Sequence, residues 1–327
     1  AIFMRKLLVR TTFIAITGSN GKTTATRILS EVLRSQAPMR STRYNRNTFM
    51  GLTEAIAFCN PLKTRFAVVE AGAGQKNGIR KAVELIRPDI SVVLSVFLEH
   101  RSFFRTIEAV AAEKSILLSE LPENGVAVIN ADDPLVAEMP VPPGRKIIRF
   151  GSSADFDVYC EDAISAWPQL LKFTAVVHGQ RQEIETRFLG MHWTGPILAS
   201  IAVAHSLGVP LPQIARVISE VTPYPGRMQV IRLPSGAIVI RDEFKASEHT
   251  ISVAFAEMEK ARAKRKFLAF CDMSETSRSP RDRLERTGKR AADIFDDVLF
   301  IGAGAQHGVR GACSAGLDPQ RVRAFPD

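Results

Sequence analysis

Short apolar segments alternate with segments of helical spacing through the first part of the chain. The runs TTFIAIT, RFAVVEAG, ISVVLSV and GVAVI are rich in Val and Ile, and the segments between them repeat apolar residues every three or four positions. Buried strands separated by helices predict a mostly parallel sheet that helices cover on both faces. A more polar, strand-rich stretch follows from about Lys146 to Phe188, and two helical patterns come after it. The expected fold class is therefore α/β.

The segment TPYPGRM, residues 222–228, marks the expected joint between two domains because it carries two prolines and a glycine. Beyond it the alternation restarts with AIVIRDEF, KFLAFCDM and DVLFIGAG, each next to a helical pattern. We predict a central domain over residues 1–222, with a mostly parallel sheet flanked by helices. A second, Rossmann-like α/β domain is expected over residues 223–327.

The motif TGSNGKTT, residues 17–24, follows the first apolar strand and precedes a helical pattern. The strict phosphate-loop pattern needs a glycine where Ile16 stands, so this motif is a shortened form of that loop. Its glycines let the backbone turn tightly and bring N–H groups to a phosphate, next to a helix N-terminus. Lys22 can reach the terminal phosphates, and the Thr23 hydroxyl can hold Mg²⁺. The simpler alternative is a strand-to-helix turn with a solvated lysine. We prefer nucleotide binding to that alternative and predict a P-loop central domain. Its nucleotide-binding residues would be Gly18, Ser19, Asn20, Gly21, Lys22, Thr23 and Thr24.

Composition and charge narrow the classes of partner. With 46% hydrophobic and 24% charged residues, the composition is that of an ordinary globular protein, and no apolar run is long enough to predict a membrane span. The net charge of +9 would suit nucleic acid, but the basic residues are spread out and no aromatic-interleaved patch appears. A nucleic-acid-stimulated ATPase would rest on charge alone, so we do not expect a nucleic-acid partner. A cationic cleft for anionic small molecules, or a basic surface without specific use, explains the charge equally well.

The four cysteines indicate the compartment. Cys59, Cys160, Cys271 and Cys313 are widely separated and form no CxxC pair, so neither a zinc site nor a disulfide framework is implied. A reducing, cytoplasmic location is expected. The opening AIFMRKLLVRTTF is basic and apolar but too short for a secretion signal.

Polar residues follow several of the expected strands, at the edge where open parallel sheets bind ligands. Glu70 ends AVVEAG, and Glu99 with His100 ends LSVFLEHR. Lys114 lies in a helical pattern, and NADDP follows another strand. Taken singly, each has a simpler interpretation: a solvated strand end for Glu70, a cap or core contact for His100, and a surface charge for Lys114. For NADDP we favour the structural interpretation, a capped turn.

In this order the motifs resemble the Mur ligase family. These are ATP-dependent amide ligases that build peptidoglycan stem peptides, with relatives that make polyglutamyl folate and cyanophycin. The resemblance covers nearly the whole chain and is closest to the branch that adds D-Ala-D-Ala to a UDP-muramoyl tripeptide, as judged from AEKSILLSELPENGVAVINADDP, GMHWTGP, PYPGRM and LAFCDMSE. It implies that ATP phosphorylates a substrate carboxylate and that an amine attacks the acyl phosphate, releasing amide, ADP and phosphate.

The resemblance also implies roles for individual residues. Lys22, His100 and Lys114 would be catalytic, with Lys114 carbamylated by CO₂ into an anionic Mg²⁺ ligand. The ATP contacts outside the phosphate loop would be His192, Arg227 and Asp242. The metal ligands would be Thr23, Glu70, His100 and Lys114. The implied cofactors are ATP and Mg²⁺, and the implied substrates are an anionic small-molecule carboxylate and an amino acid or peptide amine.

The sequence departs from the family pattern at several points. The N-terminal, UDP-binding domain has no counterpart, so a protein partner that supplies this surface is one expectation and a fragment is the other. The second domain is expected to be incomplete. Pro196 replaces an asparagine that lies near the adenine in that branch, and FKASE from Phe244 replaces its YNANP. A cyanophycin- or polyglutamate-type ligase, and a degenerate nucleotide-binding subunit that needs a partner, are therefore the alternatives.

Overall fold

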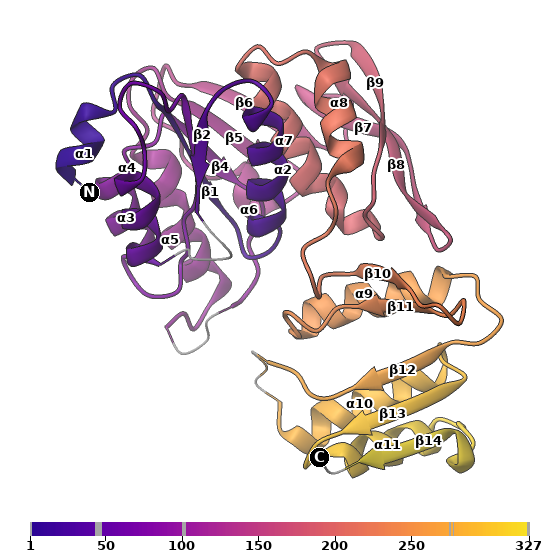
Figure 1. The fold of residues 1–327 in the computed structure, drawn as a ribbon. Helices are drawn as coiled ribbons and strands as arrows, with labels where there is room; N and C mark the ends of the chain where they lie inside the picture. Colours follow the sequence, from indigo (N-terminus) through magenta and orange to yellow (C-terminus); the bar gives the residue numbers. More distant parts are fainter. Residues whose placement is uncertain (1, 43–47, 100–102, 275, 277, 326–327) are drawn as a thin grey trace. The chain divides into compact units, whose positions relative to one another are not determined.

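The computed structural model describes residues 2–42, 48–99, 103–274, 276 and 278–325. The chain divides into two compact units (Figure 1). The first comprises residues 1–164, 171–187 and 191–222, and the second comprises residues 223–327 together with 165–170 and 188–190. The main change of unit thus falls between Thr222 and Pro223, inside the proline-rich segment.

A nine-stranded sheet dominates the first unit, in the order β2-β3-β1-β4-β5-β6-β7-β8-β9. From β2 to β7 neighbouring strands pair in parallel, and β8 and β9 form an antiparallel pair. The strands are β1 (Thr12–Thr17), β2 (Met39–Ser41), β3 (Phe66–Glu70), β4 (Ile90–Val93), β5 (Val126–Asn130), β6 (Lys146–Gly151), β7 (Val158–Ala166), β8 (Gln169–Val177) and β9 (Gln180–Glu185). The α/β expectation with a mostly parallel sheet is confirmed.

Helices cover both faces of this sheet (Figure 1). They are α1 (Ile2–Leu7), α2 (Lys22–Arg34), α3 (Phe49–Ala57), α4 (Gly78–Ile86), α5 (Ile107–Ser119), α6 (Pro134–Ala137), α7 (Thr194–Ser206) and α8 (Leu211–Glu220). Phe13 and Ala15 of β1 pack with α3, α4 and α5 in one buried cluster. Ile14 and Ile16 point to the opposite face, because side chains alternate along a strand, and they are equally buried. Burial on both faces explains why this strand is a continuous apolar run, and each such side chain contributes about 1.5–3 kcal/mol.

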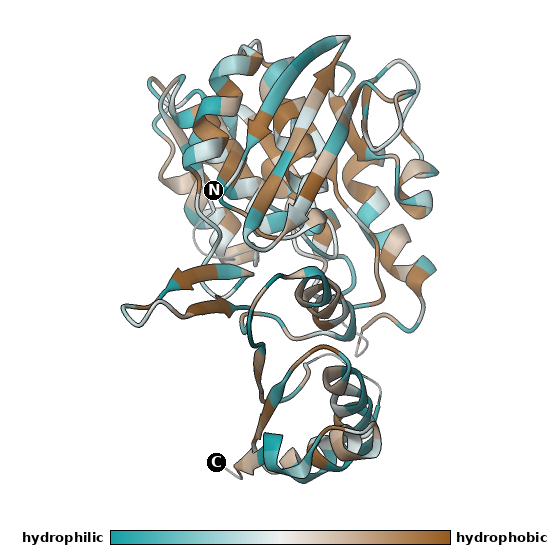
Figure 2. Ribbon diagram, turned by 90° about the vertical axis from the view of Figure 1, so that its right-hand side faces the viewer, coloured by the Kyte–Doolittle hydropathy of each residue, from teal (hydrophilic) through white to brown (hydrophobic). Residues whose placement is uncertain are grey.

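The outer strands of the sheet are less buried. β8 and β9 alternate between exposed and buried positions, as expected where one face meets solvent. In Figure 2 the strands at this end of the sheet, which face the viewer, carry both hydrophobic and hydrophilic residues along their length. None of the described helices, in either unit, combines the length and the apolar composition needed to cross a membrane.

The second unit has its own α/β core. A three-stranded parallel sheet, β12-β13-β14, packs with three helices, and β10 and β11 form a separate antiparallel pair. The elements are β10 (Gln229–Arg232), β11 (Ile238–Arg241), α9 (Glu248–Lys260), β12 (Phe267–Phe270), α10 (Pro280–Ala292), β13 (Asp297–Ile301), α11 (Ala305–Ser314) and β14 (Val322–Phe325). The parallel sheet with its helices agrees with the expected second α/β domain.

Strand order places the candidate site. β1 pairs with β3 on one side and with β4 on the other, so the loops that leave the carboxyl ends of these strands diverge around the end of β1. Open parallel sheets bind ligands at such a switch point. The TGSNGKTT loop follows β1, Glu70 ends β3, and residues 94–99 follow β4.

Candidate active site

The loop between β1 and α2 requires glycine at two positions. Gly18 and Gly21 have φ values of 153° and 83°. A Cβ on Gly18 would lie 2.9 Å from the Cβ of Leu94, and one on Gly21 would lie 2.7 Å from the Cγ of Pro196. Backbone conformation and close approach therefore both exclude a side chain. Because Gly21 is the N-cap of α2, no side chain at that position caps the helix, which suits an anion at its N-terminus.

Lys22 folds back over this loop. Its Nζ donates hydrogen bonds to the backbone oxygens of Gly18 and Ser19. The ammonium group thus lies over the turn that the glycines shape. The Thr24 hydroxyl is buried and has no hydrogen-bond partner among the described residues. A cation, a tight glycine turn and a helix N-terminus together fit the phosphates of a nucleotide.

A side-chain clamp joins the phosphate loop to the segment after β4. The Ser19 hydroxyl accepts from the Phe97 N–H at 2.9 Å and donates to the Phe97 carbonyl at 3.1 Å. The Ser19 N–H donates to the Ser95 carbonyl at 2.8 Å, and the Asn20 N–H donates to the Ser95 hydroxyl at 3.1 Å. Two loops that follow neighbouring strands are therefore held as one piece.

Thr23 in the first turn of α2 contacts Glu70 at the end of β3. The Thr23 hydroxyl donates to Glu70 Oε2 at 3.2 Å, and Glu70 is only 1% exposed. The Glu70 N–H in turn donates to the Thr42 hydroxyl at 3.1 Å. A hydroxyl and a carboxylate beside a phosphate loop are hard oxygen ligands of the kind that Mg²⁺ prefers.

Lys114 is fully buried, with 0% of its surface exposed, and its Nζ donates to Glu99 Oε1 at 2.9 Å. The simpler interpretation from the sequence, a surface charge on a helix, is wrong. A buried ammonium is tolerated here because a buried carboxylate faces it, and Glu99 comes from the segment that Ser19 clamps. His100 lies outside the described residues. Among the residues that are described, no three His, Cys, Asp or Glu side chains gather as a metal cluster.

The NADDP turn is structural, as predicted. Asp133 is the N-cap of α6, and its carboxylate also accepts from the Val96 N–H at 2.7 Å. The Asn130 amide donates to the Leu94 carbonyl at 2.8 Å. This turn therefore supports the segment after β4 from the side opposite the phosphate loop.

In the second unit, Arg227 and Asp242 flank the same short segment. The Arg227 guanidinium lies 4.5 Å from the ring centroid of Phe244 and 5.9 Å from that of Tyr224. The Asp242 carboxylate accepts from the Met228 N–H at 3.0 Å. Burial raises the pKa of Asp242 to about 7, although the Met228 hydrogen bond and the nearby Arg227 oppose this effect.

The last expected residue, His192, lies near the start of α7, and so does Pro196, which replaces the family's asparagine. His192 belongs to the short 3₁₀ turn Met191–Trp193, and its ring centroid lies 4.4 Å from that of the Trp193 ring. Pro196 is buried within α7 and faces the Cα of Gly21. Thus Pro196 forms the floor of the phosphate loop, a role that the sequence comparison with an asparagine did not suggest.

A family model of the Mur ligase middle domain matches residues 16–204, which include the phosphate loop, Glu70, Lys114 and His192. The chain belongs to this family.

Individual relatives extend the similarity beyond the middle domain. UDP-N-acetylmuramoyl-tripeptide--D-alanyl-D-alanine ligase of Escherichia coli is 27% identical over 294 residues, which are 88% of this chain and 64% of that ligase. The ligase of the same name from Mycobacterium bovis is 25% identical over 300 residues, 90% of this chain and 59% of the relative. The chain thus spans 59–64% of the length of these two relatives.

Solved structures share the fold. MurF from Acinetobacter baumannii superimposes with a TM-score of 0.89 at 24% identity, covering 99% of this chain and 69% of that one. Folylpolyglutamate synthase from Mycobacterium tuberculosis, complexed with ADP and AMPPCP, gives a TM-score of 0.74 at 16% identity and covers 99% of this chain and 85% of that one. The fold is that of Mur ligases and folylpolyglutamate synthases.

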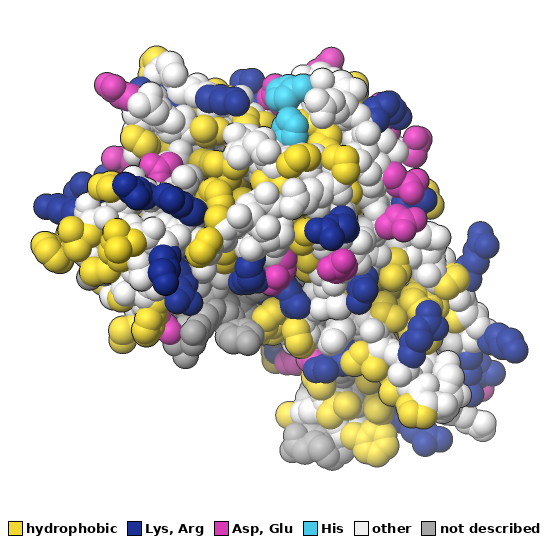
Figure 3. Space-filling model, turned by 45° about the horizontal axis from the view of Figure 1, so that its top comes forward, with side chains coloured by type: hydrophobic (Ala, Val, Ile, Leu, Met, Phe, Trp, Pro, Cys, Tyr) yellow, Lys and Arg dark blue, Asp and Glu magenta, His cyan; other side chains and the backbone are white. Residues whose placement is uncertain are grey.

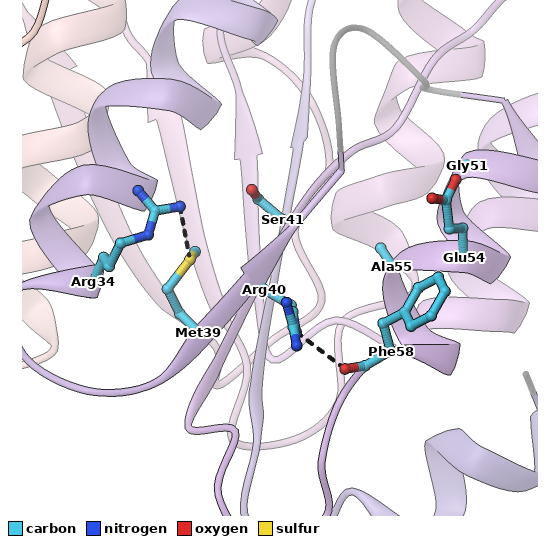
Figure 4. A pocket seen from close by; sticks show the side chains of 8 residues that line it. All are labelled: Arg34, Met39, Arg40, Ser41, Gly51, Glu54, Ala55 and Phe58. Atoms are coloured by element: carbon cyan, nitrogen blue, oxygen red, sulfur yellow. Dashed lines mark hydrogen bonds between the residues drawn. The ribbon is translucent and has the colours of Figure 1, made fainter.

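One pocket of this Mur ligase family member lies away from these residues. It measures about 280 Å³ and opens beside the edge strand β2, between the end of α2 and α3 (Figure 4). The Arg34 and Met39 side chains lie on one side of β2. Phe58, the C-cap of α3, lies on the other side, and the Phe58 carbonyl accepts a hydrogen bond from the Arg40 side chain at 3.0 Å. None of the expected site residues lines it.

Side chains of both charge signs are mixed on one face of the molecule. On the face shown in Figure 3, Lys and Arg side chains are interspersed with acidic and hydrophobic ones and form no single stripe. Nothing on that face resembles a track for a nucleic-acid backbone.

Two partners in the site were missed by the sequence. The sequence placed Glu99 at a strand end but gave it no role. The available signal was that Glu99 is a further carboxylate in the same set of motifs as Lys114, and so a candidate partner for it. Glu113, next to Lys114 on α5, is 7% exposed and had no signal of its own, because its partners are backbone N–H groups far away in sequence.

Proposed function

We propose that this chain is an ATP-dependent, ADP-forming ligase that joins a carboxylate to an amine as an amide. The observation that supports this proposal most is that the phosphate loop, its contact with Glu70 and the segment leading to Lys114 all lie at the same edge of the sheet. Lys22 covers the phosphate loop, Thr23 contacts Glu70, and the segment clamped by Ser19 leads to the buried pair of Lys114. Membership of the Mur ligase middle domain family supports the same reaction class.

In the proposed reaction the γ-phosphoryl group of ATP passes to the substrate carboxylate. The neutral amine then attacks the carbonyl carbon of the acyl phosphate, and inorganic phosphate leaves with the bonding electrons of the C–O bond. The nitrogen gives up one proton, which the departing phosphate accepts. Lys22 and the α2 N-terminus neutralise the charge of the transferred group, and the rigid loops align the reactants. Water is kept from Lys114 and Glu99 by their burial.

We assign the remaining roles within the same proposal. Thr23 and Glu70 would hold one Mg²⁺, and His100 with a carbamylated Lys114 would hold a second. Carbamylation would require the Lys114 nitrogen to give up its ion pair with Glu99. Bound Mg²⁺ would supply charge neutralisation at the phosphoryl oxygens. The ATP contacts outside the loop would be His192, Arg227 and Asp242. Residues 1–222 would then act as the ATP-binding domain and residues 223–327 as the ligase domain that brings Arg227 and Asp242.

The substrates proposed first are those named by the relatives, a UDP-N-acetylmuramoyl tripeptide and D-alanyl-D-alanine. A protein partner that completes the carboxylate site, and a cytoplasmic location where ATP is available, belong to this proposal. Two alternatives remain: a degenerate nucleotide-binding subunit, and a ligase of the cyanophycin or polyglutamate type. The following experiment distinguishes both from the proposed function.

The test combines calorimetry with product detection. Binding of a non-hydrolysable ATP analogue with Mg²⁺ is measured for the natural chain, Lys22→Ala and the control Lys81→Ala, an exposed lysine of α4. We expect binding that only Lys22→Ala abolishes, and ADP release with the tripeptide and D-alanyl-D-alanine. Binding without ADP release from any acid and amine pair would indicate the partner-dependent subunit. ADP release only with free glutamate or aspartate as the amine would indicate the polyglutamate or cyanophycin type.

A further inference from the structure

Adjacent residues of α5 hold two different strand-end loops. Lys114 pairs with Glu99 in the segment after β4. Glu113 binds the other way, to the residues 71–77 that connect β3 with α4, which we call the 71–77 loop. One turn of one helix therefore sets the positions of both loops at the carboxyl edge of the sheet.

Both oxygens of Glu113 are used. Oε1 accepts from the Ile79 N–H at 2.9 Å and Oε2 accepts from the Asn77 N–H at 3.0 Å. The Gly78 N–H between them donates to the Gln75 carbonyl at 3.1 Å. The first amides of α4 are thus consumed by the protein itself, so this helix start serves as an anchor and not as an anion site. A buried carboxylate at a helix N-terminus is favoured by the helix dipole as well.

The other end of the 71–77 loop is anchored too. The Ala71 N–H donates to the Ile16 carbonyl at 2.9 Å, and Ala71 and Ala73 are buried. The loop folds back on itself, because a Cβ on Gly78 would lie 3.1 Å from the Gly72 carbonyl oxygen. Between the two anchors, residues 74–77 are exposed, and this exposed tip carries the cation Lys76.

The loop starts directly after Glu70, whose carboxylate already contacts Thr23 of the phosphate loop. Under the proposed function the phosphates occupy the α2 side of Glu70. The substrate carboxylate must then reach the γ-phosphoryl group from another loop of the same edge. The 71–77 loop is next to Glu70 in sequence, hydrogen bonds anchor both of its ends, and its tip is cationic.

We propose that Glu113 is a positioning residue that presents the 71–77 loop to the carboxylate substrate, with Lys76 contacting an anionic group of that substrate. This inference rests on the proposed function and adds a substrate-binding element to it. Glu113→Gln keeps the size of the side chain but replaces one accepting oxygen by an NH₂ group. The loop anchor loosens as a result, while the phosphate loop keeps its own contacts.

The test measures binding of the UDP-N-acetylmuramoyl tripeptide by calorimetry, with the Mg²⁺ complex of the ATP analogue present. Lys76→Ala and Glu113→Gln should each weaken tripeptide binding by about fivefold or more, the loss of one charge-assisted contact, and change analogue binding by less than about twofold. The matched controls are Lys81→Ala on α4 and Glu120→Gln, whose exposed carboxylate pairs with Arg80 across the same two helices at 3.2 Å. Both controls should leave tripeptide binding unchanged.

A double variant adds a readout that a general loss of stability would not give. Lys76→Ala combined with Glu113→Gln should bind the tripeptide no more weakly than the weaker single variant, because both remove the same contact. Equal tripeptide binding by the natural chain and Lys76→Ala, or no binding by the natural chain, would overturn the inference. Lys76→Ala decides if Glu113→Gln does not fold. Tripeptide binding without ADP release would refute the proposed function and leave this inference standing.

Discussion

Lys114 and Glu99 lie 2.9 Å apart, and the two side chains are 0% and 6% exposed. One comes from the middle of α5 and the other from the segment after β4, so the pair ties a helix to a strand-end loop. In such a site each charge depends on the other, because neither is hydrated.

Removing only the lysine should therefore destabilise the first unit strongly. Lys114→Met retains most of the volume but removes the ammonium group that faces the buried Glu99 carboxylate. Breaking one side of a buried ion pair costs roughly 3–5 kcal/mol of unfolding free energy. Urea denaturation measures the change, and Lys114→Met with Glu99→Gln should recover a large part of it. Arg80→Met breaks an exposed pair between α4 and α5 and should cost less than about 1 kcal/mol. Equal losses for Lys114→Met and Arg80→Met would contradict this account.

Comparing Gly21→Ala with Gly144→Ala separates the cost of a strained backbone from the cost of a steric clash. Gly144 has nearly the same φ, 79° against 83°, but a Cβ there would meet nothing within 4 Å. Gly144→Ala should therefore cost about 1 kcal/mol of unfolding free energy, the strain alone, and Gly21→Ala clearly more. Gly21→Ala should also weaken binding of the ATP analogue, and adding Pro196→Ala should restore part of both losses. No recovery in the double variant would show that Pro196 is not the obstacle.

Thr23 is expected to couple nucleotide binding to Mg²⁺. Thr23→Val removes the hydroxyl that contacts Glu70 and keeps the shape of the side chain. With Mg²⁺ present, the affinity for the ATP analogue should fall about tenfold, because the proposal makes the lost hydroxyl a metal ligand. With EDTA present, the affinity should change little. Thr23→Ser retains the hydroxyl and should retain the Mg²⁺ effect. A loss of the same size with and without Mg²⁺ would argue against the assignment.

Asp242 should make stability fall as pH rises. Its pKa is raised to about 7 in the folded chain, because burial disfavours the carboxylate, whereas an unfolded aspartate has a pKa near 3.9. The folded state therefore binds the proton more tightly, and this stabilisation is complete below about pH 4 and lost as pH passes 7. The loss is at most about 4 kcal/mol for a shift of this size.

Asp242→Asn should flatten this part of the pH dependence, as measured by urea denaturation between pH 5 and 8. Glu243→Gln is the control, since the hydrogen bond from Arg241 lowers the pKa of Glu243. A lowered pKa makes the folded state less stable as pH falls, which is the opposite of the effect of Asp242. An unchanged pH profile for Asp242→Asn would refute the raised pKa.

Local patterns predicted much of the fold. The strand over Thr12–Thr17 and the helix over Gly78–Ile86 were both visible because their apolar residues follow the period of the element over several turns or pleats. β2 and β10 were not predicted, because three or four residues show no period and their pairing with distant strands determines them.

The site was predicted less completely, for a physical reason. The glycines, Lys22 and Thr23 form one contiguous motif, so their proximity follows from the sequence. The partnership of Lys114 with Glu99 and that of Glu113 with the 71–77 loop depend on how α5 packs, and helical spacing alone made Lys114 a surface residue.

The contact between Gly21 and Pro196 also has a consequence for the order of folding. The floor of the phosphate loop comes from α7, and Ser200 of the same helix donates to the Ala25 carbonyl of α2 at 3.2 Å. These contacts join segments that are distant along the chain, and closing such a long loop is slow compared with forming a helix. A nascent chain that ended before Thr194 would contain every residue of TGSNGKTT and still lack the surface on which that loop rests. Affinity for nucleotide would then arise late during synthesis, long after the motif itself has left the ribosome.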